Sequence, residues 1–493
     1  MKVLSRILAL AGLALAAGPA DAGMRYGELE FAPCVLGEGL PLPPAAARCA
    51  TLEVPEDPWQ PEGSRRIALA LAWVPATGRA EPEPVFFIAG GPGQSAREAF
   101  PSLLPAFAEL NRSRDLFFLD QRGTGGSHRL DCPEPTPAFE SFAAGEALRA
   151  RAREYAAACR EALAGRADLR RYGTREAVAD LEAVRGRLGA ERIVLIGVSY
   201  GTRVAQEYAR AHPARTAALV LDGVVPPTRV FANEVAANLE AALNRLFERC
   251  RADASCVERL GDPGELLARA RARLEAGGLP AIRFRDPTTG EGREQALDYP
   301  SFAGLLRMYA YHPLGMSLIP YLLREVAHGE DGTALALDVL LERELNRQMA
   351  LGMQLSVLCT EDADAFAPRP GDEGTLLGTT FVEILASLCA EWPKGEPEPR
   401  RREPLAGDFP ALLLSGEFDP VTPPAYGEEA MARLSRARHL VLPGQGHNVL
   451  AAGCLPKLLA QFLERGEAAS LDASCLERLA PLPILSAPYG WEP

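Results

Sequence analysis

The sequence of 493 residues has almost no lysine, few histidines and no long apolar stretch beyond its N-terminus. Lys and Arg number 52 against 65 Asp and Glu, which gives a net charge of -13, and basic residues form no long run. We therefore expect no nucleic-acid partner. No later stretch approaches about 18 uncharged apolar residues, so we expect no stable membrane association. The 6 histidines and the cysteines show no zinc-ligand spacing, and we expect neither a metal nor another cofactor.

The N-terminus has the pattern of an export signal. Lys2 and Arg6 flank the start of an apolar run at 7–17, and Ala22 closes a small-residue motif that suits a signal peptidase. The run is too short to cross about 30 Å of hydrocarbon as an anchor. We predict that residues 1–22 are a cleaved signal peptide and that the protein is exported, to the periplasm or the extracellular space. All ten cysteines follow this segment, which fits an oxidising compartment.

Short apolar runs alternate with helical patterns along much of the chain. With 47% apolar and 24% charged residues, the composition is that of a globular protein. Strands that are apolar on both faces and separated by helices predict an α/β fold with a mostly parallel sheet. The predicted strands are 67–74, 85–89, 116–120, 192–196, 218–222, 411–415 and 439–442, with helices at 175–188 and 202–211 between some of them.

One region interrupts this alternation. From about residue 225 to 402 the sequence is rich in Ala, Leu, Arg and Glu at helical spacing and has no comparable series of strands. We interpret it as a mainly helical cap inserted into the sheet domain before the last strands. The predicted organisation is a first core part at 23–224 that includes an N-terminal extension, a cap at 225–404, and a second core part at 405–493.

The segment Gly-Val-Ser-Tyr-Gly centred on Ser199 has the pattern of a nucleophile elbow. It directly follows the predicted strand 192–196 and opens the predicted helix 202–211. The tight turn between such elements needs small neighbours, so that the serine hydroxyl stands clear above the sheet. We therefore predict that Ser199 is a catalytic nucleophile.

A serine nucleophile needs a base, and one histidine is well placed to serve as one. In α/β-hydrolases the order along the chain is Ser, then Asp or Glu, then His. His447 lies in a loop just after the last predicted strand. The remaining histidines fall in a turn, at a helix end, in the insertion or at a strand start, and they are His128, His212, His312, His328 and His439.

The acid of the triad should follow the strand 411–415. Both Glu417 and Asp419 lie in that loop and could orient His447. We prefer Asp419, because the following proline fixes the turn at the strand exit. Glu417 stays open as the alternative acid.

A glycine loop after the strand 85–89 predicts an oxyanion hole. The segment Gly90-Gly-Pro-Gly93 leaves its backbone free of side chains, so that N–H groups can point at a substrate. We assign the two donors to the N–H groups of Gly91 and of Tyr200, the residue after the nucleophile. The loop lacks the pattern and the lysine of a phosphate-binding loop.

Three segments together resemble the prolyl iminopeptidase and tripeptidyl aminopeptidase family of α/β-hydrolases. They are Gly90-Gly-Pro-Gly93, Asp120-Gln-Arg-Gly-Thr-Gly-Gly-Ser127 and Gly197-Val-Ser-Tyr-Gly-Thr202. The resemblance extends through Asp419 and His447 and covers nearly all of the mature chain. The secreted tripeptidyl aminopeptidase-like branch fits best. Ala89 departs from the histidine that often opens the glycine loop in prolyl iminopeptidases.

The resemblance implies a serine exopeptidase that acts near the free N-terminus of peptides. Such an enzyme needs a carboxylate to hold the substrate ammonium, and a lid that excludes long chains. Within the cap, Glu361 and Asp362 are the candidate amine-binding residues, because a disulfide at Cys359 would hold them rigidly. The segment 120–127 is expected to brace the oxyanion loop.

The resemblance and the local spacing imply five disulfides between neighbouring cysteines. The expected pairs are Cys34 with Cys49, Cys132 with Cys159, Cys250 with Cys256, Cys359 with Cys389, and Cys454 with Cys475.

Two other functions remain open. A carboxylesterase or lipase would use the same triad, because the fold hosts many chemistries. A binding protein without activity on a hydrolase scaffold is the remote alternative. No pattern in the sequence indicates an oligomeric state.

Overall fold

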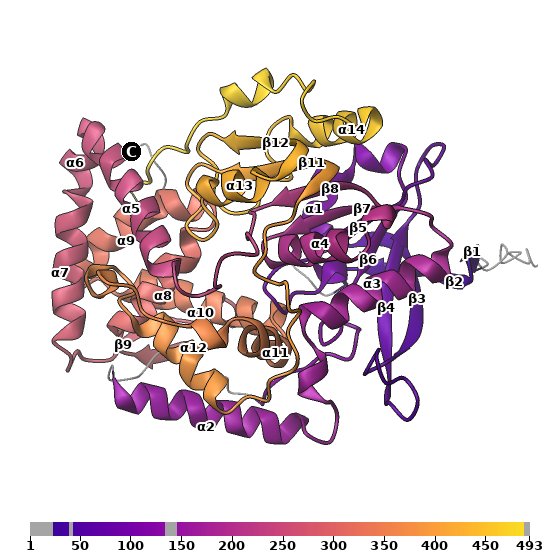
Figure 1. Cartoon of the computed structure of the whole chain (residues 1–493). Coiled ribbons are helices and arrows are strands. Elements are labelled where there is room, and N and C mark those ends of the chain that lie inside the picture. The colour runs from indigo at the N-terminus through magenta and orange to yellow at the C-terminus, as the bar shows by residue number, and fades with distance from the viewer. Residues whose placement is uncertain (1–22, 39–42, 134–144, 488–493) are drawn as a thin grey trace, which may run out of the picture.

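The computed structural model describes residues 23–38, 43–133 and 145–487. The predicted signal peptide lies outside these ranges. No helix within them is long and apolar enough to cross a lipid bilayer. Figure 1 shows a sheet with flanking helices on one side of the molecule and a helical lobe on the other.

A single ten-stranded sheet forms the centre of the core. In spatial order its strands are β1 (Met24–Tyr26), β2 (Leu29–Leu36), β3 (Ala45–Pro55), β4 (Arg66–Val74), β6 (Leu116–Leu119), β5 (Val85–Ile88), β7 (Ile193–Val198), β8 (Thr216–Asp222), β11 (Gly407–Gly416) and β12 (Leu434–Leu442). The first four strands pair antiparallel with their neighbours, as β4 does with β6. From β6 to β12 all neighbours are parallel. The predicted α/β fold is thus confirmed as a mixed sheet.

The parallel strands are covered on both faces. Every residue of β5, β6 and β7 is buried, as expected for parallel strands between two helical layers. Successive residues alternate between the layers, so Phe86 packs in one apolar core and Phe87 in the other. The helices on the Phe86 side are α3 (Thr174–Leu188), α4 (Tyr200–Ala211) and α13 (Pro424–Met431), and those on the Phe87 side are α1 (Ala96–Phe107) and α14 (Leu455–Arg465).

All seven predicted strands are present, and β11 and β12 are longer than expected. The strands β1, β2 and β3 were not predicted from the sequence. In β2 and β3, exposed and buried positions are mixed, and both strands include Cys and Pro. A search for runs that are apolar on both faces does not detect such strands.

The cap is mainly helical, as expected. Its helices are α5 (Val235–Ala252), α6 (Ala254–Leu260), α7 (Pro263–Glu275), α8 (Tyr299–Tyr309), α9 (Pro313–Ala327), α10 (Gly332–Gln348), α11 (Leu351–Glu361) and α12 (Thr380–Ala390). A small antiparallel hairpin of β9 (Ile282–Arg285) and β10 (Gly292–Gln295) was not expected.

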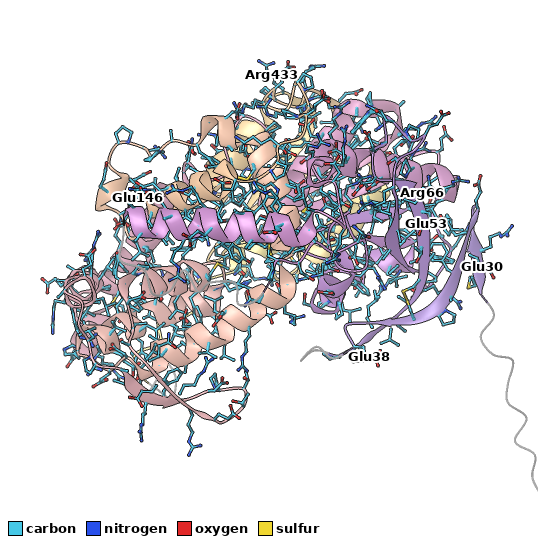
Figure 2. The ribbon with its side chains drawn as sticks, turned by 90° about the horizontal axis from the view of Figure 1, so that it is seen from below. Glu30, Glu38, Glu53, Arg66, Glu146 and Arg433 are labelled. Carbon is cyan, nitrogen blue, oxygen red and sulfur yellow. A yellow bond between two sulfur atoms is a disulfide. The ribbon has the colours of Figure 1, made fainter. Side chains whose placement is uncertain are left out.

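One helix outside 225–404 belongs to the cap. Helix α2 (Glu146–Leu163) packs against α12 and shares an apolar cluster with it. Arg149 of α2 forms an ion pair with Glu383 of α12 at 2.6 Å. Figure 2 shows α2 running from Glu146 along the outside of the molecule. The predicted boundary is therefore corrected, because the first core part also contributes a helix to the cap.

The ten cysteines form the five expected pairs. Three of the bonds lie within the cap. Cys132–Cys159 holds α2 to the chain that leads into it, Cys359–Cys389 joins α11 to α12, and Cys250–Cys256 joins α5 to α6. The other two lie between β2 and β3 and at α14.

A buried arginine stabilises the loop that follows β6. Arg122 is 0% exposed and donates two hydrogen bonds of 2.7 Å to Asp180 of α3. It also donates to the carbonyl oxygens of Glu56 and Arg171 at 2.6 and 2.8 Å. The guanidinium thus joins four separate segments of the core.

We expect Arg122→Ala to lower the free energy of unfolding by about 3–5 kcal/mol, because it leaves the Asp180 carboxylate buried without its partner. Chemical denaturation measures this change. Arg283→Ala is the control, because Arg283 pairs with Glu294 on the exposed hairpin and such pairs contribute at most about 1 kcal/mol. Equal effects of the two substitutions would contradict the role given to Arg122.

Candidate active site

Ser199 lies at a sharp turn between β7 and α4. Its backbone has φ 54° and ψ -123°, a conformation that is strained for any residue with a side chain. A Cβ on Gly197 would stand 2.4 Å from the carbonyl oxygen of Gly201. A Cβ on Gly201 would stand 2.2 Å from the carbonyl oxygen of Ile88. Both glycines of the motif are therefore required by close backbone packing, and the elbow has the predicted form.

His447 and Asp419 are in direct contact. The Nδ1 atom of His447 lies 2.8 Å from Oδ2 of Asp419. Oδ1 of Asp419 accepts the N–H groups of Val421 and Thr422 at 2.9 Å each, and the Thr422 hydroxyl donates to Oδ2 at 2.7 Å. These donors fix the carboxylate, which in turn orients the imidazole with Nε2 free for another partner.

Glu417, the alternative acid, is engaged elsewhere. Its Oε2 accepts the N–H of Gly444 at 2.8 Å. Its own N–H donates to the Leu442 carbonyl at 3.1 Å, which ties the loops after β11 and β12 together. The structure therefore pairs Asp419, and not Glu417, with His447.

The environment of His447 favours its charged form. Burial opposes protonation, but the charge and hydrogen bond of Asp419 and the charge of Asp222 outweigh it and raise the pKa of His447 above 6.5. An imidazole with this bias accepts a proton readily from a hydroxyl.

The glycine loop lies against the nucleophile. A Cβ on Gly90 would stand 3.0 Å from the Cβ of Ser199. Gly91 has φ 104° and precedes Pro92 in a cis peptide bond. Gly91 and Ser199 line the same cavity, and Tyr200, as the first residue of α4, has an N–H without an acceptor inside the helix. This arrangement suits the predicted oxyanion hole.

The segment after β6 braces this loop. Asp120 accepts the Ser95 hydroxyl at 2.6 Å and the N–H groups of Arg97 and Gly126 at 3.1 and 2.9 Å. Ser95 caps α1, which follows the glycine loop directly. Gln121 donates to the carbonyl of Ala89 at 3.3 Å. These are the contacts expected if residues 120–127 brace the glycine loop.

A cavity of about 2610 Å³ lies between the core and the cap. Gly91, Ser199 and His447 line it from the core. The cap lines it mostly with apolar side chains, among them Leu314, Leu318, Leu341, Leu377 and Phe381. Ser199 therefore lines a partly open chamber that is large enough for a short peptide.

The cap also contacts His447 directly. The carbonyl of Tyr311 accepts the N–H of His447 at 2.7 Å, and the two rings meet edge to face with centroids 5.2 Å apart. A Cβ on Gly446 would stand 2.3 Å from the same carbonyl. Tyr311 was not predicted as a site residue, because nothing in the local sequence links it to a loop that is distant along the chain.

Glu361 and Asp362 do not lie in this cavity. Glu361 accepts the N–H and the hydroxyl of Thr174 at 2.7 and 3.0 Å, and Asp362 pairs with Arg203 of the elbow helix at 2.7 Å. Burial raises the pKa of Glu361 to about 7, against the opposing charge of Arg203. The two carboxylates line a separate cleft of about 720 Å³.

The position of Glu361 corrects its expected role. Thr174 also contacts the hydroxyl of Tyr200 at 2.7 Å, so Glu361 connects the end of α11 to the elbow helix through one side chain. Together with the Arg203–Asp362 pair, this contact clamps the cap onto α4. The structure brings Ser199, Asp419, His447, Gly91 and Tyr200 together and leaves the two expected amine-binding residues outside.

Within the described ranges, no group of three or more His, Cys, Asp or Glu is arranged to hold a metal ion.

The backbone strain at Ser199 can be measured by substitution. Ser199→Ala and Ser199→Gly should both lack activity, but Ser199→Gly should be more stable to denaturant by about 1 kcal/mol, because glycine adopts positive φ without a Cβ clash. Ser102, exposed within α1, is the control: there the glycine variant should be the less stable by about 1 kcal/mol. The same order at both positions would argue against strain at Ser199.

Comparisons with known proteins identify the fold family. A family model for the alpha/beta hydrolase fold matches residues 83–452. Serine protease Hip1 of Mycobacterium tuberculosis is 25% identical over 487 residues, which cover 91% of each chain. Tripeptidyl aminopeptidase of Streptomyces lividans is 32% identical over 216 residues, 41% of this chain and 39% of that protein.

Proline iminopeptidase of Mycobacterium smegmatis is similar among solved structures, with 17% identity, a TM-score of 0.37, and coverage of 85% of this chain and 100% of that chain. By the match of the family model, the chain belongs to the α/β-hydrolase fold family.

Proposed function

We propose that the protein is an exported serine exopeptidase that hydrolyses peptide bonds near the free N-terminus of peptides. The observation that carries this proposal is the position of Ser199, which stands on a strained elbow and faces a chamber roofed by the cap. Five disulfides support the exported location. The release of a tripeptide or of a single proline is consistent with the names of the relatives.

The chemistry would be acyl transfer. His447 takes the proton of the Ser199 hydroxyl as the oxygen attacks the scissile carbonyl. The N–H groups of Gly91 and Tyr200 stabilise the oxyanion, and loss of one such donor costs about 10²–10³ in rate. The imidazolium, oriented by Asp419, protonates the leaving amine. Water then cleaves the acyl-enzyme by the same route.

The cap beside Ser199 supports an exopeptidase. The cavity that Ser199 lines lies between the core and the cap, and α2, fastened by Cys132–Cys159, runs along the outside. We expect these elements to restrict folded proteins more than short peptides and chain ends.

The charge of the chamber supports a cationic N-terminus. Asp338 of α10 lines the cavity and is 8% exposed. Burial and the charges of Glu342 and Asp298 raise the pKa of Asp338 to about 7. Both neighbours also line the cavity, so the carboxylates repel one another there. A substrate ammonium beside these carboxylates would add a positive charge and would favour their ionised forms.

A substrate panel tests the proposal. We expect faster cleavage of Ala-Ala-Pro and Pro chromogenic amides with a free N-terminus than of their N-acetylated forms, with Ser199→Ala inactive on both. A p-nitrophenyl ester is the comparison substrate. Hydrolysis of the ester without any amidase activity would contradict the peptidase and favour a carboxylesterase, and activity retained in Ser199→Ala would contradict the mechanism.

Asp338→Asn should raise KM for free N-termini about tenfold, because one charge-assisted hydrogen bond is lost. The KM for acetylated peptides should stay within a factor of two or so, since these carry no ammonium. Asp408→Asn, at an exposed position on β11, is the control. If the ratio of free to acetylated rates does not change in Asp338→Asn, this carboxylate does not bind the amine.

A further inference from the structure

A fully buried carboxylate, Asp222, lies beside the triad at the end of β8. Its exposed fraction is 0%, and it pairs in register with Val198, the residue before the nucleophile. The main-chain carbonyl of Asp222 accepts the N–H of Ser199 at 2.8 Å. The backbone of Asp222 therefore supports the elbow directly.

The side chain of Asp222 reaches the histidine loop. Oδ2 accepts the N–H of Val449 at 2.8 Å and that of Leu450 at 3.0 Å. These residues follow His447 by two and three positions. Asn448, which lies between His447 and Val449, has φ 68°. The two hydrogen bonds hold the chain where it turns away from the imidazole. The second oxygen, Oδ1, is buried without a hydrogen-bond partner among the described residues.

The strand end also touches the imidazole. A Cβ on Gly223, the residue after Asp222, would stand 2.9 Å from Cε1 of His447. Gly223 has φ 65°, so glycine is favoured there by conformation as well as by space. The two residues Asp222 and Gly223 at the end of β8 therefore contact Ser199, the ring of His447 and the loop after His447.

We propose that Asp222 is a positioning residue of the triad, which holds the backbone after His447 so that the imidazole stays aligned between Asp419 and Ser199. The proposal rests on the triad of the proposed function. Asp222 does not face the chamber and acts through the backbone. A displacement of about 1 Å in such a support can cost about 10²-fold in rate.

The charge of Asp222 provides a readout that a merely structural role would not move. Burial raises its pKa to about 7, although the Val449 N–H and His447 favour the ionised form. The other charged or titratable groups that act on Asp222 or His447 are Asp419, Arg307 of α8 and His312 before α9. Ionised Asp222 raises the pKa of His447, so its removal should lower that pKa.

The test uses the rate at which a fluorophosphonate inactivates the full-length protein. The Ser199 oxygen bonds to phosphorus, fluoride leaves, and His447 takes the proton, so no peptide specificity is needed. We expect Asp222→Ala to react about 100-fold more slowly. Asp222→Asn keeps an oxygen acceptor for both N–H groups and should recover to within about tenfold of the parent. The acid limb of its pH–rate profile should move to lower pH, because the negative charge that raises the pKa of His447 is gone.

Asp115→Ala and Asp115→Asn are the matched controls. Asp115 is also buried and accepts the Trp73 indole N–H and the Ala76 N–H at 2.9 and 3.0 Å. It precedes β6 and therefore lies at the amino end of that strand, whereas Asp222 lies at the carboxyl end of β8. We expect these variants to be less stable than the parent protein but to keep its inactivation rate and its acid limb. If Asp222→Ala does not fold, the acid limb of the pH–rate profile of Asp222→Asn tests the role of Asp222.

Three outcomes would overturn the role of Asp222. They are an inactivation rate in folded Asp222→Ala equal to that of the parent, an equal loss of rate in both Asp222 variants, and an acid limb in Asp222→Asn that does not move. Labelling of Ser199 without peptide cleavage would overturn the proposed exopeptidase and would leave the Asp222 comparison valid. The two failures are therefore distinguishable.

Discussion

The backbone of Ser199 is the constraint on which the rest of the site depends. A residue with positive φ between a buried strand and a helix is held only when its surroundings leave no alternative. Here Gly201 packs on the carbonyl of Ile88, and the N–H of Ser199 is bound by the end of β8. The parallel order of β5, β7 and β8 is what brings these three strand ends together. Loss of any of these contacts would let the turn relax and would lower the hydroxyl toward the sheet.

The site could be predicted where chemistry and spacing act locally. The elbow, the glycine loop and the loop carrying Asp419 each follow an apolar strand, and a parallel sheet places such ends at one edge. The choice between Asp419 and Glu417 depended on turn chemistry, and the structure pairs Asp419 with His447. The fold class followed from the same alternation of strands and helices.

Other features depend on contacts that no local pattern records. Glu361 was expected to bind substrate because it is acidic and near a cysteine, but Thr174 and Arg203, distant in sequence, surround it. Helix α2 fell within the predicted first core part, because the cap was predicted from the helical composition that begins at about residue 225, but the apolar face of α2 packs on α12. Asp222 ends a predicted strand, and only the folded chain shows that its side chain faces the histidine loop.

The hydrogen bond from the N–H of His447 to the carbonyl of Tyr311 fastens the histidine loop to the cap. Tyr311 lies between α8 and α9, so any displacement of these helices would remove the acceptor and expose one side of the imidazole. The position of the cap and the position of His447 are therefore coupled through one main-chain hydrogen bond.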